Sequence, residues 1–179
     1  SLTTDFGCSV VLCTATQPTL QGHIGGDPAP HGEGGFEGLP RNNVHELIKN
    51  PQELFEKMNR TNVTYIPEKI DSWEKVAKQL IQYDQVLCIV NTRKDCKALY
   101  DSMPPDTIHL SASMCGQHRS NLIAEIKRKL KKGDSIRVVS TQLVEAGVDI
   151  DFPVVYRAVA GLDSVAQAAG RCNREGKLK

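Results

Sequence analysis

Three polar side chains near the end of the sequence have the types and spacing of a phosphate-binding set. Gln167, Arg171 and Arg174 stand at positions i, i+4 and i+7, which predicts that they share one face of an α-helix. Two guanidinium groups on one face repel each other unless an anion or a carboxylate lies between them. The planar guanidinium fork also matches a phosphate group bidentately. Two surface arginines paired with acids would give the same pattern, so this segment alone leaves both interpretations open.

A second segment, residues 141–151, follows a short apolar run and carries groups that suit a nucleotide or a phosphate. Thr141 offers a hydroxyl group and a backbone N–H to a phosphate oxygen. Gly147 permits a close approach of the backbone or a positive φ. Asp149 could accept a hydrogen bond from a ribose hydroxyl, because an ionised carboxylate only accepts. An ordinary capped loop with an acidic surface residue is equally compatible.

The spacing of the cysteines and histidines in the sequence does not indicate a metal site. His109, Cys115 and His118 give His-x5-Cys-x2-His, which is not a usual zinc spacing, so we expect no metal ion on this chain. The 6 cysteines contain no Cys-x-x-Cys pair. This usage favours free thiols in a reducing cytoplasm over a disulfide framework.

Strands and helices must alternate to position these groups. Apolar runs predict strands at 62–66, 85–90, 107–110, 136–140 and 154–157. Amphipathic spacing and capping residues predict helices near 71–81, 92–102, 117–132 and 163–171. The expected caps are Asp71 with Glu74, Asn91-Thr92, and Asp163 or Ser164. This alternation predicts an α/β fold with a parallel sheet flanked by helices. In such sheets, ligands bind beyond the carboxyl ends of the strands.

The first 60 residues differ in composition from the rest. They carry 4 basic and 7 acidic side chains, a net charge of −3, whereas residues 61–179 have a net charge of +4. Residues 8–13 predict a strand buried on both faces, and residues 21–40, with 7 glycines and 3 prolines, predict a linker. A helical turn at 44–48 and a helix at 51–58 are expected next. No apolar run approaches the roughly 20 residues that span a bilayer, so no membrane partner is expected.

Four segments, taken together, resemble the motifs of superfamily 2 helicases and occur in that family's order. Cys13-Thr14-Ala15-Thr16 resembles motif III, and Val90-Asn91-Thr92 resembles motif IV. Ser140 to Asp149 resembles motif V, and Gln167-x-x-Gly170-Arg171-x-x-Arg174 is similar to motif VI. The longer run STQLVEAGVDIDFPVVYRA and the later LDSVAQAAGRCNREG resemble the CRISPR-associated helicase-nucleases of type I systems.

The resemblance implies a domain organisation. Residues 61–179 would be the second RecA-like helicase domain, of the P-loop NTPase type and truncated at its C-terminus. Residues 1–20 would be the end of the first RecA-like domain, and residues 21–60 a Gly/Pro-rich linker with short helices. Members of the family hold ATP between two RecA-like domains, with single-stranded DNA across them, and carry a metal-dependent HD nuclease domain.

The cofactors that the family uses would be bound mainly outside this sequence. It contains no G-x-x-x-x-G-K-[ST] phosphate loop, no Asp-Glu dipeptide and no His-Asp dipeptide. ATP and Mg²⁺ would therefore be held mainly by the first RecA-like domain, and the nuclease metal only by the HD domain. We expect this chain alone to be inactive.

The resemblance also assigns residue roles at the nucleotide. Arg171 and Arg174 would be arginine fingers that reach the γ-phosphate, with Gln167 near the phosphates or the attacking water. Gly147 and Asp149 would line the nucleotide.

Other residues would serve the DNA side. Thr141 would contact the DNA backbone, and so would Asn91 and Thr92. Thr14 and Thr16 would couple the ATP site to the DNA site. Arg119, near the start of the 117–132 helix, is a further DNA candidate, whereas the lysines near its end favour an interaction with the helix dipole.

The function so implied is part of an ATP-dependent DNA helicase or translocase that acts with a nuclease in CRISPR interference against foreign DNA. Its partners would be single-stranded DNA and a Cascade-type crRNA surveillance complex, in the cytoplasm. Another superfamily 2 motor, for restriction or repair, is an alternative, as is a stand-alone binding module derived from helicases. Plain phosphate binding by a Rossmann-like domain lacks its glycine fingerprint here.

Overall fold

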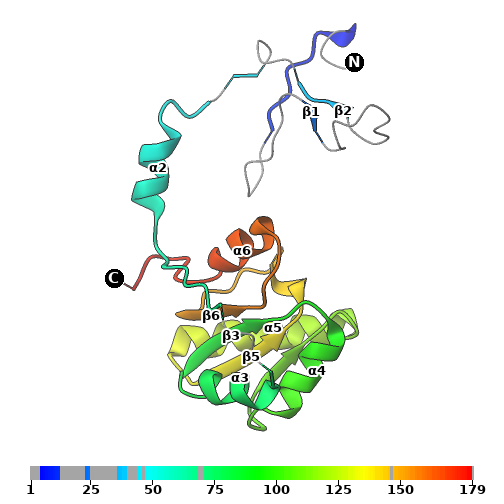
Figure 1. The fold of residues 1–179 in the computed structure, drawn as a ribbon, viewed down its shortest axis with the longest axis vertical. Helices are drawn as coiled ribbons and strands as arrows, with labels where there is room; N and C mark the ends of the chain where they lie inside the picture. The colour runs from blue at the N-terminus through cyan, green and yellow to red at the C-terminus, as the bar shows by residue number, and fades with distance from the viewer. Residues whose placement is uncertain are drawn as a thin grey trace. The chain divides into compact units, whose positions relative to one another are not determined.

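The computed structural model describes residues 5–12, 23–24, 36–39, 44–45, 47–67, 71–145 and 147–178. The chain divides into two compact units, Ser1–Met58 and Asn59–Lys179 (Figure 1). None of the described helices is both long and apolar enough to cross a bilayer.

The described part of the first unit contains little regular structure. Strands β1 (His23–Ile24) and β2 (Phe36–Glu37) form a short antiparallel pair. Helix α2 (Pro51–Met58) confirms the predicted helix and begins with proline, whose missing N–H has no intrahelical acceptor at that position. The expected helical turn at 44–48 is wrong, because its described residues are not helical.

The second unit is built on a parallel sheet, as the alternation of elements predicts. The order is β4-β5-β3-β6, with β3 at Gln85–Ile89, β4 at Ile108–Leu110, β5 at Ile136–Ser140 and β6 at Val154–Arg157. Every neighbouring pair in this order is parallel.

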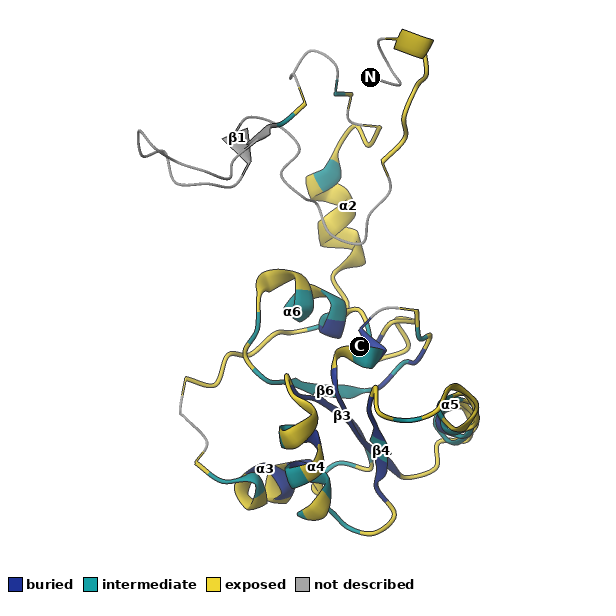
Figure 2. Cartoon of the chain, turned by 90° about the vertical axis from the view of Figure 1, so that its right-hand side faces the viewer, coloured by how far each residue is buried: buried dark blue, intermediate teal, exposed yellow. Residues whose placement is uncertain are grey.

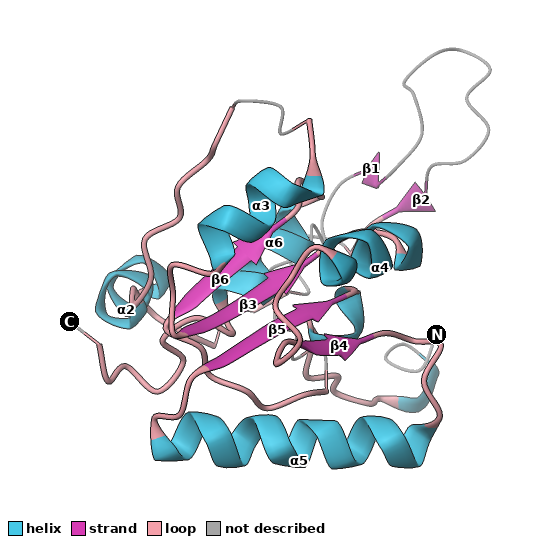
Figure 3. Cartoon of the chain, turned by 90° about the horizontal axis from the view of Figure 1, so that it is seen from below, coloured by secondary structure: helices cyan, strands magenta, loops and turns pink. Residues whose placement is uncertain are grey.

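Helices cover both faces of this sheet, because alternate strand residues point to opposite faces. Val86, Cys88 and Val90 pack with α3 (Trp73–Leu80) and α4 (Arg93–Asp101). Leu87 and Ile89 pack with α5 (Gly116–Lys132) and α6 (Leu162–Ala169). Figure 3 shows α5 along one side of the sheet, with α3 and α4 on the other. Figure 2 shows β3 and β4 as mainly buried and β6 as intermediate.

The helix caps agree with the sequence in part. Of the predicted pair Asn91-Thr92, Thr92 is the N-cap of α4, and its hydroxyl oxygen accepts a hydrogen bond from the Asp95 N–H at 3.0 Å. The cap of α3 is Ser72 rather than Asp71, and Asp71 instead pairs with Lys75 one turn along. Helix α6 is preceded by Gly161 and has no side-chain cap, so the predicted Asp163 or Ser164 cap is wrong.

The end of α6 corrects the sequence prediction most strongly. The helix stops at Ala169, so Arg171 and Arg174 do not share a helical face with Gln167. The N–H groups of Arg171 and Cys172 turn back to the carbonyls three residues before them, at 2.9 Å each. Asn173 then adopts a left-handed φ of 46°, which ends any continuation of the helix.

Two predicted strands do not form in the described residues. Asn62 to Ile66 has no ladder partner, and residues 8–12 also lie outside any strand. In the second of these segments, Val10, Val11 and Leu12 are exposed. An apolar run becomes a buried strand only where neighbouring strands satisfy its backbone groups, and the described residues supply none for either segment.

The turn after α5 yields a stability prediction. Gly133 ends α5 with a φ of +77°, and a Cβ there would meet open space, so the cost of Gly133→Ala comes from the left-handed backbone. We expect a loss of about 1–2 kcal/mol in the free energy of unfolding, measured by urea denaturation. The control is Gly116→Ala at the first position of the same helix, which also faces open space. It should be neutral or stabilising by up to about 1 kcal/mol. Equal losses in the two variants would contradict this explanation.

Candidate functional site

Strand register brings the motif residues to one edge of the sheet. Ile89 is paired with Ser140 on one side and with Arg157 on the other, and Ser140 is paired with Leu110. Because all four strands are parallel, their carboxyl ends meet in this row. The loops that carry Asn91, Thr92, Thr141 and Asp149 therefore leave the sheet at the same edge.

A network of polar side chains joins these loops. Arg157, the last residue of β6, donates from Nη1 to Asn91 Oδ1 at 2.6 Å and to its neighbour's carbonyl, Ala158 O, at 2.9 Å. Asn91 Nδ2 donates to Val159 O at 2.8 Å. Gln142 Nε2 donates to the backbone carbonyl of Asn91, also at 2.8 Å. Asn91 thus links the loop after β3 to the segments that follow β5 and β6, although the residue itself is exposed.

A buried ion pair lies within this network. Arg157 Nε is 2.7 Å from Glu145 Oε1, and both side chains are only 7% exposed. The N–H is not aimed at that oxygen well enough to count as a hydrogen bond, so the contact is an ion pair of close charges. Removing one partner of such a pair leaves a lone buried charge and typically costs about 3–5 kcal/mol.

Arg171 holds the same loop from a second direction. Its Nε donates to Val144 O at 3.0 Å and its Nη2 donates to Glu145 O at 2.7 Å. Burial, together with the neighbouring charge of Arg174, lowers the pKa of the Arg171 guanidinium. A guanidinium remains charged near neutral pH even so. Two of its donors are therefore committed to the carbonyls of the 3₁₀ turn η2 (Gln142–Val144) and of the residue after it.

Arg174 is the more accessible of the two arginines. Its Nε lies 3.4 Å from Asp149 Oδ1, and the side chains are 46% and 74% exposed respectively. The structure therefore brings together two residues that the sequence separates by 25 positions. An exposed pair of this kind contributes little stability, so the guanidinium can exchange this carboxylate for another anion at low cost.

The backbone at Arg174 is fixed by an acidic residue. The Asp151 carboxylate accepts from the N–H of Arg174 at 2.7 Å and from the N–H of Glu175 at 3.2 Å. Asn173 is buried and bonds through its side chain to Arg60 O, Leu178 O and Leu178 N, each at 2.9 Å. These contacts hold the turn that presents the Arg174 side chain.

The remaining predicted site residues occupy different environments. Gln167 lies on α6 and is half-buried. Gly147 has a φ of +71° in the exposed part of the loop, which a side chain would strain. Thr141 is buried, and its N–H donates to Leu110 O at 3.2 Å. Its backbone is thus used to join the loop to β4.

The surface beyond β3 and β4 carries the predicted DNA candidates. Thr92 is exposed, Arg119 is half-buried on α5, and Arg93 Nη1 donates to Ser113 Oγ at 3.2 Å. Lys129, Lys131 and Lys132 lie in the last turn of α5, where cations complement the helix dipole. Thr14 and Thr16 lie outside the described residues.

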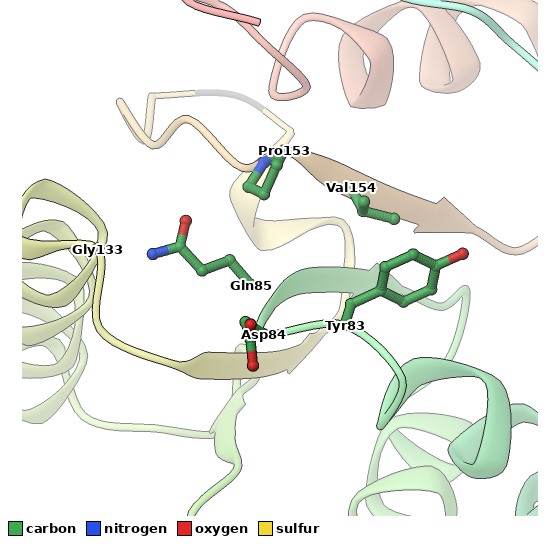
Figure 4. A pocket seen from close by; sticks show the side chains of 6 residues that line it. All are labelled: Tyr83, Asp84, Gln85, Gly133, Pro153 and Val154. Atoms are coloured by element: carbon green, nitrogen blue, oxygen red, sulfur yellow. The ribbon is translucent and has the colours of Figure 1, made fainter.

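A shallow pocket of about 300 Å³ lies at the amino ends of the strands, away from the candidate site. It is lined by Tyr83, Asp84, Gln85, Gly133, Pro153 and Val154 (Figure 4). The Gln85 amide is already bonded to Asp134 O at 2.9 Å. The pocket lies at the amino ends of β3 and β6 and contains no predicted site residue. Within the described ranges, no group of three or more His, Cys, Asp or Glu side chains could hold a metal ion.

Sequence reasoning missed the internal partners of the site: Glu145, Arg157, Gln142, Asp151 and Asn173. The sequence did contain one indication that Arg157 has an internal partner. Arg157 ends the apolar run Val154-Val155-Tyr156, and a charge that closes a strand of buried type requires a partner. Nothing in the sequence identifies that partner as Glu145.

Comparison with protein families places most of the chain in one of them. The family model described as "CRISPR-associated nuclease/helicase Cas3, C-terminal" matches residues 75–177, which include every predicted site residue except Thr14 and Thr16. The CRISPR-associated nuclease/helicase Cas3 of Haloferax volcanii is 31% identical over 154 residues, 80% of this chain and 16% of that protein. The protein of the same name from Methanothermobacter thermautotrophicus is 30% identical over 111 residues, 60% of this chain and 13% of that protein. The chain thus spans less than one fifth of either relative.

Solved structures show the same fold. The crystal structure of T. fusca Cas3 with ADP has a TM-score of 0.51 and 23% identity, covering 66% of this chain and 15% of that one. The T. fusca Cas3 structure with ATP has a TM-score of 0.50 and 21% identity, covering 64% and 15%. The parallel sheet with helices on both faces is therefore the RecA-like fold of these proteins, as the sequence predicts.

The contacts of Asp151 generate a prediction. Asp151→Ala leaves the N–H groups of Arg174 and Glu175 without their acceptor, so the free energy of unfolding should fall by about 1.5–3 kcal/mol. Urea denaturation of the chain measures this. The control is Asp151→Asn, which keeps one acceptor oxygen and should lose clearly less. Equal losses for the two variants would mean that the acceptor oxygen kept in Asp151→Asn contributes nothing, and would contradict this explanation.

Proposed function

This chain belongs to the family of Cas3 C-terminal segments, and we propose that it is the second RecA-like domain of an ATP-dependent DNA helicase or translocase. The motor would act with a nuclease in CRISPR interference against foreign DNA. The observation that carries the proposal is the gathering of Asp149, Arg171 and Arg174 at the carboxyl edge of the sheet, from loops far apart in sequence. Such a site suits a nucleoside triphosphate, because guanidinium groups bind phosphate oxygens and a carboxylate accepts hydrogen bonds from ribose hydroxyls.

The residues present fit one side of an ATP site. Arg174 would reach the terminal phosphate, Asp149 and Gly147 would line the nucleotide, and Gln167 would lie near the phosphates. The bound nucleotide supplies the phosphoryl group whose transfer arginine side chains promote by stabilising charge. The phosphate loop and the Mg²⁺ ligands would come from the other RecA-like domain, so this chain alone should not hydrolyse ATP.

The two arginines would have different roles in this proposal. Arg171 already donates twice to the 144–145 carbonyls, so it would shape the loop while it contributes charge. Arg174 pairs only with an exposed carboxylate in the described structure, and its guanidinium is the better placed of the two to move onto a phosphate.

Single-stranded DNA would lie across the surface formed by Thr92, Arg119 and the Asn91 and Thr141 loops. Aromatic residues make up only 5% of the sequence, so contacts to the backbone phosphates would dominate over base stacking. A crRNA surveillance complex of the Cascade type would deliver the DNA, in the cytoplasm. Both curated relatives carry the Cas3 name, which favours this motor over one for restriction or repair.

The finger assignment predicts a kinetic effect. In the longer protein that carries both RecA-like domains, Arg174→Ala should lower kcat for ATP hydrolysis by about 10³- to 10⁵-fold. Arg171→Ala should lower it too, with an added loss of thermal stability because two loop carbonyls lose their donor. Steady-state ATPase assays and thermal melts measure both. Arg128→Ala, on the exposed part of α5, is the matched control and should retain activity. If both the Arg171 and the Arg174 variants hydrolyse ATP at the wild-type rate, the assignment of these residues as arginine fingers is wrong.

The DNA surface predicts a change in salt dependence. If Arg119 neutralises one phosphate, Arg119→Ala should reduce the slope of log Kd against log salt by about one. Fluorescence anisotropy with a labelled single-stranded oligonucleotide measures this slope. Lys132→Ala, in the last turn of α5, should leave the slope unchanged if that lysine serves the helix dipole. A slope that falls only for the lysine variant would move the DNA path to the end of α5.

A further inference from the structure

One arginine holds two loops of the candidate site from within the protein. Arg157 reaches Glu145 beyond β5 through Nε and Asn91 beyond β3 through Nη1, at 2.7 and 2.6 Å. Gln142, in the loop after β5, completes this network by donating to the Asn91 carbonyl at 2.8 Å. This network of side-chain contacts therefore fixes the loop after β3 relative to the loop after β5. The sheet register alone does not supply such contacts.

The burial of this pair makes it an unusual choice for stability alone. The Arg157 and Glu145 side chains are each 7% exposed, and Arg157 is paired in register with Ile89, which belongs to the apolar core with Leu87 and Phe152. Replacing a buried ion pair by well-packed apolar residues is often neutral or stabilising. An ion pair at this position can instead specify geometry, because any arrangement that separates the two charges leaves each of them buried without its partner.

The loop after β3 belongs to the proposed DNA surface, whereas the loop after β5 begins with Thr141 on that surface and continues to the proposed nucleotide site. Asn91 and Thr92 lie in the loop toward the DNA surface, and Gly147 and Asp149 lie in the loop toward the nucleotide. Arg171, which belongs to the nucleotide side, also donates to the Glu145 carbonyl at 2.7 Å. Glu145 is therefore held by its side chain and by its backbone, from two different elements.

We propose that Arg157 and Glu145 are positioning residues that keep the loop at 90–92, after β3, and the segment at 141–145, after β5, in a fixed relation and so couple DNA binding to ATP hydrolysis. The coupling part of this inference rests on the proposed helicase function. The loop-holding part concerns this chain alone and can be tested without nucleotide or DNA. Arg157 touches neither ligand in this scheme and acts only through Asn91 and Glu145.

The first experiment measures amide hydrogen exchange in the chain by NMR. The Glu145 amide donates to Gln142 O at 2.9 Å within the loop, and the Val90 amide donates to Ser140 O at 2.9 Å within the sheet. Arg157→Met should speed exchange at Glu145 relative to Val90, since the loop loses its anchor while the sheet persists. An unchanged ratio of the two rates would overturn the loop-holding role.

The structure offers a matched control for the loss of a buried arginine. Arg137 on β5 is 15% exposed, donates to Ile81 O at 3.2 Å and pairs with Asp106 at 3.6 Å, at the opposite edge of the sheet. Arg137→Met should lower the melting temperature without changing the exchange ratio. A rise in the ratio as large as that of Arg157→Met would show that the effect is general destabilisation, and would overturn the inference.

The second experiment uses the longer protein and compares ATP hydrolysis with and without single-stranded DNA. Arg157→Met should reduce the stimulation by DNA roughly two- to thirtyfold, the range expected for residues that modulate coupling. It should reduce the DNA-free rate much less, and Arg137→Met should preserve the stimulation. Full stimulation in the Arg157 variant overturns the coupling role. Absence of stimulation in the wild-type protein instead refutes the proposed function, and the exchange experiment then decides the loop-holding role by itself.

A double variant separates positioning from stability. Arg157→Met with Glu145→Leu removes both charges, so the melting temperature should recover above that of either single variant. DNA stimulation should stay low, because apolar side chains cannot bond to Asn91 and so cannot fix the loops. Recovery of stimulation together with stability would show that the pair acts only as a structural contact.

Discussion

The parallel register of the second unit is the constraint on which the rest of the structure depends. It places Leu110, Ser140, Ile89 and Arg157 in one row, so every loop that leaves the sheet there starts from the same edge. The two apolar faces enforce this register, because a slip of one residue would exchange the side chains that face α3 and α4 with those that face α5 and α6. Residues distant in sequence become neighbours as a consequence of core packing.

Above that edge, polar contacts replace apolar packing as the source of order. The 141–145 segment is short and partly 3₁₀, and its backbone is bonded to the sheet at its start, where the Thr141 N–H donates to Leu110 O. Arg157 and Arg171 hold its end, one through the Glu145 carboxylate and one through backbone carbonyls. This leaves the more exposed Asp149 and Arg174 with only a weak mutual contact. The site thus combines a rigid inner layer with outer charged groups that can exchange partners.

The early end of α6 serves this arrangement. Had the helix continued, Arg171 and Arg174 would lie on one helical face and would repel each other at close range. Asn173 in a left-handed conformation and the Asp151 carboxylate instead turn the backbone, so that Arg171 points to the loop and Arg174 to Asp149. The two guanidiniums therefore have different environments, and their proposed roles differ accordingly.

The sequence by itself determined the α/β class, four of the five strands from residue 62 onward and the cap of α4 within Asn91-Thr92. Periodicity and capping are local, and local patterns are enough for these features. The tertiary structure alone decided that the predicted 62–66 strand has no partner among the described residues, that α6 ends at Ala169, and that Glu145 is the partner of Arg157. Each depends on which segments meet in space, and a sequence pattern shows that a buried charge needs a partner without showing which one it finds.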